Sequence, residues 1–109
     1  MSYFQSSGER KTRQLAPGAN LRTFWGERIM ISLVDLAPGT EVALHTHPHE
    51  QAGMVLQGQI EMEIGGEQKT IKRGDVYIVT SNVPHWVKVG RRKAQVIDLF
   101  SPVREEYKY

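Results

Sequence analysis

The strongest constraint on the fold of this chain is a period of two in its apolar residues. Ile60, Met62 and Ile64 alternate with polar side chains, and this alternation is typical of a strand that buries one face. Gly65-Gly66 follows directly and predicts a tight hairpin turn into residues 67–71. This region alone therefore predicts antiparallel β-structure.

Similar segments recur along most of the chain. Apolar and β-branched stretches bounded by glycine or proline turns predict further strands at residues 28–36 and 41–47, within 72–79, and at 85–89 and 93–100. Gly-Arg-Arg at residues 90–92 predicts a short hairpin between the last two. No segment keeps a helical period over ten or more residues. We therefore expect an all-β protein, folded as one small barrel.

Length and composition limit the classes of protein to which the chain can belong. A chain of 109 residues is long enough for one domain with its own core; we expect residues 1–20 to form a polar N-terminal segment and residues 21–109 the domain. The absence of cysteine excludes disulfides and thiolate metal sites. The apolar runs are too short to span a bilayer, and residues 1–20 contain no apolar signal-peptide core. These features predict a cytoplasmic protein with no membrane partner.

The charge of the chain is nearly balanced, with a formal net value of +2. The densest basic cluster surrounds the predicted turn at Gly90 and consists of Lys88, Arg91, Arg92 and Lys93. No aromatic residues interleave with this cluster, as a platform for stacking bases would require. We therefore expect a solvated turn and no nucleic-acid partner.

The four histidines fall in two short stretches of the chain. His45 and His47 occupy alternate positions of a predicted strand, so they project from the same face. Two neighbouring imidazoles can bind a divalent cation through neutral nitrogens. His85 opens another predicted strand and is a third candidate ligand. His49 follows Pro48, which ends regular strand pairing, and we expect it in a loop behind the metal or facing a substrate.

Residues 39–58 resemble the first motif of the cupin superfamily. Five residues separate Gly39 from His45, and Gln51 stands where the motif usually carries glutamate. Gly58 lies at the expected distance beyond it. The resemblance implies a single-domain cupin β-barrel, also called a double-stranded β-helix or jelly roll, covering most of the chain from about residue 25 onward.

Residues 74–87 resemble the second cupin motif, and here Gly74 and His85 agree in spacing. Thr80, Asn82 and Val89 depart from the proline, glycine and asparagine that this motif usually carries. The second half of the resemblance is therefore looser than the first.

A glutamine among the metal ligands has a chemical consequence. Its carbonyl oxygen is neutral, so with three histidines it leaves the 2+ charge of a divalent ion uncompensated. Such an ion binds less tightly and acts as a stronger Lewis acid on the oxygens of an anionic substrate. Glu50 is an alternative ligand, but on a strand it would point to the opposite face. The ligand types suit one divalent transition metal, and zinc, nickel, manganese, iron and copper all stay open.

Asp98 lies within an apolar segment and shares a strand face with Val96 and Phe100. An unpaired buried carboxylate costs several kcal/mol, so this position requires an explanation. Asp98 either pairs with an arginine or lies at a sheet edge, or it lines the barrel interior beside the metal. In the interior, burial would raise its pKa toward that of a general acid or base.

The C-terminal residues 98–106 resemble the end of one group of small cupins, the pectin degradation proteins. This group also resembles the chain in His-x-His-Pro-His-Glu-Gln and in overall length. The resemblance implies that the protein is an enzyme that converts 4,5-unsaturated uronates into linear keto sugar acids by hydration and ring opening. Carried over by position, it implies the metal ligands His45, His47, Gln51 and His85 and the substrate residues Asp98, Phe100 and Arg104.

The implied chemistry assigns a role to each of these residues. Arg104 would bind the carboxylate of the small anionic sugar acid in bidentate fashion, unless it only pairs with a nearby acidic residue. Phe100, and with it Trp86 or Tyr77, would pack against the sugar, although packing on the outer face is the better expectation for Trp86. Asp98 would deliver a proton or activate water.

Two other functions stay open from the sequence. The protein could be a metal-dependent oxygenase or another cupin enzyme acting on a small organic molecule, or a non-catalytic binder of sugars or other small anions. We also expect a homodimer, in which residues 29–36 and the N-terminal segment supply an exchanged or edge-paired element.

Overall fold

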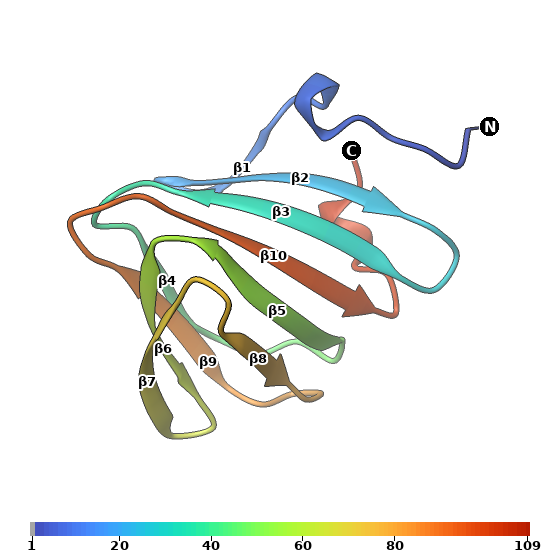
Figure 1. Cartoon of the computed structure of the whole chain (residues 1–109). Helices are drawn as coiled ribbons and strands as arrows, with labels where there is room; N and C mark the ends of the chain where they lie inside the picture. Colours follow the sequence, from blue (N-terminus) through green and yellow to red (C-terminus); the bar gives the residue numbers. More distant parts are fainter. Residues whose placement is uncertain (1) are drawn as a thin grey trace.

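The computed structural model describes residues 2–109 and arranges them as two antiparallel β-sheets facing each other (Figure 1). The larger sheet has six strands in the order β1-β2-β3-β10-β5-β8, and the smaller has four in the order β4-β9-β6-β7. The strands are β1 (Arg13–Ala16), β2 (Ala19–Trp25), β3 (Met30–Leu36), β4 (Glu41–His45), β5 (Glu50–Gln57), β6 (Gln59–Ile64), β7 (Glu67–Lys72), β8 (Val76–Val79), β9 (His85–Val89) and β10 (Ala94–Ser101). Two short 3-10 helices, η1 (Ser7–Glu9) and η2 (Glu105–Tyr107), complete the elements. The predicted all-β jelly roll is confirmed.

The core lies between the two sheets and follows the predicted alternation. Ile60 and Met62 are buried on β6, which pairs with β7 through the hairpin at Gly65 and Gly66. Both glycines have positive φ, as the tight turn requires. Leu21 and Val55 of the larger sheet belong to the same apolar cluster. Burial of these alternating side chains holds the two sheets face to face.

One predicted connection is wrong. Residues 90–92 do not close a hairpin, because β9 and β10 belong to different sheets. Strand β9 pairs with β4 and β6, whereas β10 pairs with β3 and β5. The turn instead carries the chain from one sheet to the other. Strand β10 forms hydrogen bonds along both edges within the larger sheet, and this outweighs a hairpin with β9. A turn signal in the local sequence cannot reveal which strands will pair.

The strand predicted at residues 41–47 ends at His45 in the structure. His45 pairs with His85 at the end of the β4–β9 ladder, after an irregularity that begins beyond Val42. His47 lies in the loop that leads from the smaller sheet to β5. The two histidines therefore belong to different parts of the backbone, although the sequence places both on one strand.

The N-terminal segment pairs with its own chain at an edge of the larger sheet. Strand β1 pairs with β2 at the edge of the larger sheet. Arg13 donates hydrogen bonds to the carbonyls of Glu106 (2.9 Å) and Lys108 (3.2 Å), so this edge also holds the C-terminal residues. Among residues 2–109, no helix combines the length and apolar character that crossing a membrane requires.

Candidate metal centre and substrate cavity

Three histidines from separate parts of the chain converge inside the barrel. His45 ends β4, His85 begins β9, and His47 lies in the loop between β4 and β5. One ring nitrogen from each lies within 4.8 Å of the other two. The rings of His45 and His85 have centroids 4.1 Å apart, and those of His47 and His85 lie 4.9 Å apart edge to face. This cluster could hold a divalent cation.

Backbone carbonyls orient all three rings in the same way. The Nδ1 atoms of His45, His47 and His85 lie 2.7, 2.9 and 2.9 Å from the carbonyl oxygens of Ala43, His49 and Val83. A carbonyl accepts only, so Nδ1 must carry the proton and Nε2 must carry the lone pair. Such a hydrogen bond on the far nitrogen is the usual support of a metal-bound histidine.

Two of the inward-facing Nε2 atoms face no hydrogen-bond donor of the described chain, so their lone pairs suit a metal ion. Nε2 of His85 is buried and has no hydrogen-bond partner within the described chain. Nε2 of His47 faces Oε1 of Gln51 at 2.9 Å, and with the proton on Nδ1 both atoms are acceptors. A cation bound by both atoms would remove the repulsion between their lone pairs. The donor set therefore fits a divalent transition metal.

Gln51 and the alternative ligand Glu50 lie on opposite faces of β5. Gln51 is buried on β5, whereas Glu50 is exposed on the opposite face. His49 lies in the loop, as expected, and its ring centroid is 5.8 Å from that of His47. Its carbonyl orients His47, so His49 supports the cluster through its backbone.

Asn82 explains how the looser second motif still positions His85. Its φ is 65°, a left-handed value that asparagine tolerates better than most residues. Asparagine thus makes the turn for which the motif usually carries glycine. The Asn82 backbone N–H also donates to the carbonyl of His47 (2.9 Å) and joins the loop of His47 to the loop that leads into β9 and His85.

Burial keeps two of the imidazoles neutral. Burial lowers the pKa of His85 to about 4, and the neighbouring His45 and His47 add to this effect. Burial also lowers the pKa of His47, followed by the charge of Arg104. Neutral imidazole is the form that binds metals.

Asp98 lies inside the barrel, which is one of the alternatives that the sequence left open. It is 8% exposed and faces inward with Val96 and Phe100. The Tyr77 hydroxyl donates to Oδ1 of Asp98 at 2.5 Å. Burial raises the pKa of Asp98 to about 6, although hydrogen bonds from Tyr77 and Gln51 and the charge of Arg104 all lower it. Asp98 therefore has the properties of a group that exchanges protons near neutral pH.

Tyr77 reaches Asp98 across an intervening strand. Gly53 of β5 pairs with Asp98 on one side and with Tyr77 on the other. A Cβ at residue 53 would overlap the Tyr77 ring, so only glycine lets the ring lie flat over β5. Burial and then the charge of Asp98 raise the pKa of Tyr77, which keeps it a neutral donor. The sequence suggested Tyr77 only as a sugar-packing residue, and the contact with Asp98 depends on strand order.

Arg104 lies next to the same interior. It is 9% exposed, and its Nε donates to Glu106 at 3.0 Å. Its guanidinium stacks over the rings of Tyr107 (4.0 Å to the centroid) and Phe100 (5.0 Å). The Phe100 ring in turn contacts His47 edge to face, with centroids 5.8 Å apart. Pairing with a nearby acidic residue is the alternative expected for Arg104 from the sequence, and the bond to Glu106 leaves other guanidinium donors for an anion.

One cavity of about 240 Å³ joins these groups. His45, His85 and Gln51 line it together with Asp98, Phe100 and Arg104. Tyr107 and residues of β1 also line it, and neither was identified from the sequence. Trp86 points away from the cavity, as expected: its Nε1 donates to Glu63 at 2.6 Å and Lys88 lies over its ring.

Comparisons with known proteins agree with this architecture. Residues 32–100 match the model of the cupin domain family. The chain is 33% identical over 84 residues to the pectin degradation protein KdgF of Dickeya dadantii, covering 76% of each chain.

Solved structures show the same likeness over nearly the whole chain. The structure of KdgF from Halomonas sp. superposes with a TM-score of 0.91 at 27% identity, covering 99% of this chain and 100% of that one. An RmlC-like cupin from Shewanella frigidimarina has a TM-score of 0.92 at 23% identity, covering 99% and 97%, and shows the shared fold. With two converging motifs, a histidine cluster inside a jelly roll and these matches, the chain belongs to the cupin family.

Proposed function

We propose that this protein is a metal-dependent enzyme that converts 4,5-unsaturated uronates into linear keto sugar acids. One observation carries the proposal: Asp98, a buried carboxyl whose pKa is raised to about 6, shares a cavity with a buried arginine and with His45 and His85, two members of the three-histidine cluster. The likeness to two proteins named KdgF, one of them described as a pectin degradation protein, supports this substrate class.

The metal would be held by His45, His47 and His85 through Nε2 and by Gln51 through Oε1. When bound, a divalent ion in this neutral ligand set supplies Lewis acidity toward oxygens of the substrate. The remaining groups of the cavity then orient the sugar. Arg104 binds the substrate carboxylate, and Phe100 and Tyr107 present aromatic surfaces beside it.

Asp98 carries the proton chemistry in this proposal. Its carboxyl donates a proton to C4 of the C4=C5 double bond, and a water oxygen bonds to C5. The same carboxylate then takes the proton that the water loses, so Asp98 returns to its starting state. The resulting hemiketal opens by breaking the bond between C5 and the ring oxygen. This leaves a ketone at C5 and a hydrated aldehyde at C1.

The described part of the chain favours this reaction over dioxygen chemistry. Iron centres that activate dioxygen commonly combine two histidines with one carboxylate. Within residues 2–109, the cluster that could hold a metal contains histidines alone. An oxygenase would require ferrous iron and dioxygen for turnover, and a pure binding protein would show saturable binding without turnover.

The test is loss of the ultraviolet absorbance of monomeric 4,5-unsaturated galacturonate, measured against a no-enzyme control because this sugar also rearranges unaided. We predict that Asp98→Asn lowers the enzymatic rate by about 10²- to 10⁴-fold, since a general acid–base contributes on this scale. Metal content per chain should stay unchanged.

Asp35→Asn is the matched control, because Asp35 lies on the outer face of β3 and pairs with Arg22. It should retain the rate. Acceleration that survives Asp98→Asn would refute the role assigned to Asp98. If none of the five candidate metals gives acceleration, the protein does not catalyse this reaction.

A further inference from the structure

A row of polar residues crosses the inner face of the larger sheet. It consists of directly paired neighbours on β2, β3, β10, β5 and β8, namely Thr23, Ser32, Asp98, Gly53 and Tyr77. Figure 1 shows the first four of these strands side by side. All five residues are buried, and Ser32 is 0% exposed. Because residues opposite each other in a sheet project from the same face, the side chains of this row point toward the barrel interior.

The polar row lies between the apolar core and the candidate metal centre. The inner row on one side of it is wholly apolar and consists of Leu21, Val34, Val96 and Val55. The inner row on the other side contains Phe100 and Gln51, which contact His47 of the candidate metal centre. Polar groups in such a place are unfavourable unless each of them is hydrogen-bonded. The partner of each hydroxyl in the row therefore has to be identified.

Ser32 differs from the other hydroxyls of the row, because it has no hydrogen-bond partner within residues 2–109. The Thr23 hydroxyl donates to the Tyr107 carbonyl at 2.7 Å, and the Tyr77 hydroxyl donates to Asp98 at 2.5 Å. Oγ of Ser32 is buried and unpaired in the described part of the chain. Ser32 also lines the cavity of about 240 Å³ that holds Asp98. Its hydroxyl is therefore free to bond a small molecule within that cavity.

The register places Ser32 beside the reactive carboxyl. Ser32 and Asp98 are opposite residues of the antiparallel β3–β10 ladder, and the Cβ atoms of such pairs lie about 4.5–5.5 Å apart. The Tyr77 hydroxyl reaches the same carboxyl from the other side, across Gly53 of β5. Ser32 and Asp98 make no direct hydrogen bond. One water molecule can bridge two groups at this separation, because each hydrogen bond to its oxygen spans about 2.8 Å.

The proposed reaction needs such a water at a fixed position. The water oxygen bonds to C5 of the substrate, and one of its protons passes to the Asp98 carboxylate. A water that donates one hydrogen to Asp98 and the other to Oγ of Ser32 keeps its lone pairs free for C5. With Asp98 alone, the water could rotate about a single hydrogen bond. A second acceptor on the neighbouring strand removes that freedom and orients the attack.

We propose that the Ser32 hydroxyl holds the water that adds to C5 and places it against Asp98. This inference rests on the proposed function, because it assigns the position of a reactant in that reaction. One hydrogen of the water replaces the proton that Asp98 gave to C4, and the other stays on the new C5 hydroxyl, so Ser32 neither gains nor loses a proton. An unpaired buried hydroxyl destabilises the fold. Removal of this hydroxyl should therefore have opposite effects on stability and on activity.

The test is Ser32→Ala, assayed as metal-loaded protein on monomeric 4,5-unsaturated galacturonate. We expect kcat to fall about 10- to 100-fold and KM to stay within about twofold, because the groups that bind the sugar are unchanged. Its Tm should equal or exceed that of wild type, since the lost hydroxyl has no partner. Thr23→Val, in the same row, breaks a hydrogen bond and should lower Tm by about 4 °C or more. Ser6→Ala, at an exposed serine whose side chain makes no capping bond, should change neither kcat nor Tm.

Crystal structures of wild type and Ser32→Ala supply a second measurement that needs no turnover. In wild type, an ordered water should lie within hydrogen-bond distance of both Ser32 Oγ and the Asp98 carboxyl, and it should be missing in the variant. Its absence from wild type would overturn the inference, as would a Ser32→Ala variant with wild-type kcat, and in both cases an active wild type keeps the proposed function. A raised KM with unchanged kcat would also overturn it, by assigning Ser32 to the sugar. A wild type without activity would refute the proposed function and this role together.

Discussion

At the scale of single residues, the properties of Asp98 depend on residues two strands away. The Tyr77 hydroxyl reaches it only because Gly53, on the strand between them, has no side chain. The hydrogen bond from Tyr77 fixes the direction of the carboxyl and stabilises its charged form. Tyr77 is thus a positioning residue for the group assigned the proton transfer.

We predict that Tyr77→Phe lowers kcat about tenfold and leaves KM within about twofold, because the ring stays on Gly53 and only the hydroxyl is lost. The hydrogen bond lowers the pKa of Asp98, so its removal should move the corresponding limb of the pH–rate profile to higher pH. Tyr3→Phe, at an exposed tyrosine, serves as the control. A variant with reduced kcat but an unmoved pH profile would contradict this role.

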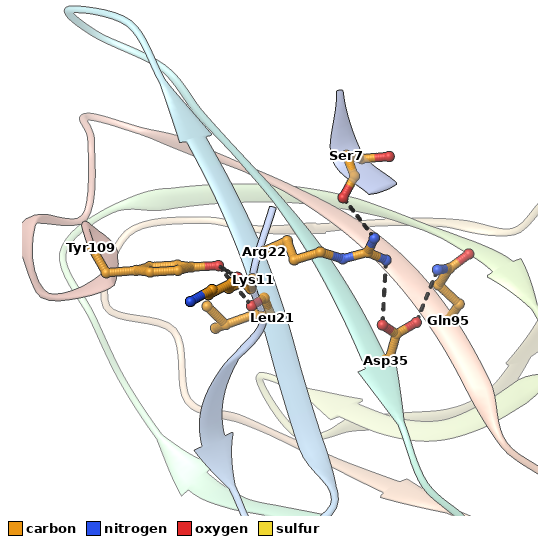
Figure 2. Close-up of polar contacts among 7 residues, drawn as sticks. All are labelled: Ser7, Lys11, Leu21, Arg22, Asp35, Gln95 and Tyr109. Atoms are coloured by element: carbon orange, nitrogen blue, oxygen red, sulfur yellow. Dashed lines mark hydrogen bonds and ion pairs between the residues drawn. The ribbon is translucent and has the colours of Figure 1, made fainter. Parts of the chain in front are cut away.

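At the scale of elements, the N-terminal strand supports the C-terminal residues that complete the cavity. Arg13 of β1 donates to two carbonyls of residues 106–108. On the neighbouring strand β2, Thr23 donates to the Tyr107 carbonyl at 2.7 Å. Tyr109 extends this contact through its hydroxyl, which donates to the Lys11 and Leu21 carbonyls (Figure 2). The position of Arg104 therefore depends on the N-terminal segment.

Arg13→Ala should raise KM for the uronate about threefold to tenfold and change kcat less than twofold. The reason is that loosening residues 104–108 weakens a binding contact worth about 1 kcal/mol without touching Asp98. Steady-state kinetics will measure both constants. Arg91→Ala, at an exposed arginine in the turn before β10, should leave them unchanged. A fall confined to kcat would show that the segment acts on the chemistry instead.

At the scale of the whole molecule, the candidate metal centre lies where the two sheets meet. His45 and His85 belong to the smaller sheet, Gln51 to the larger, and His47 to the loop between them. A metal bound by all four would cross-link the sheets and bind the native state alone. Such a ligand stabilises the fold by about 2.7 kcal/mol at 100 times its Kd.

We predict that zinc at this excess raises Tm by more than about 10 °C relative to chelated protein, as expected for a domain of this size. The rise should persist at pH 6, where an ordinary histidine is largely protonated, because the pKa of His85 is lowered to about 4 and that of His47 is also lowered. Differential scanning calorimetry with and without chelator measures it. His85→Ala should lose the response and His49→Ala should keep it. A Tm that ignores the chelator would refute a metal bridge.

Much of the fold could be predicted because its signals are local. The alternation around Ile60 and the face that Asp98 shares with Val96 and Phe100 follow from the period of two in a strand, and Gly65-Gly66 is a local turn signal. Two predictions were wrong because they depend on contacts between residues distant in the sequence. The turn at residues 90–92 joins two sheets instead of closing a hairpin, and His47 lies beyond the end of the strand that was to carry it.

The sequence by itself determined the residue types of the site and the face of the strand on which Asp98 lies, because spacing and strand periodicity are properties of neighbouring residues. Only the tertiary structure decided that Tyr77 reaches Asp98, that β1 supports Arg104 and that Ser32 lies opposite Asp98. Each of these depends on which strands are neighbours and in what register. Strand order follows from the burial of the whole core, in which residues distant in sequence compete for the same partners.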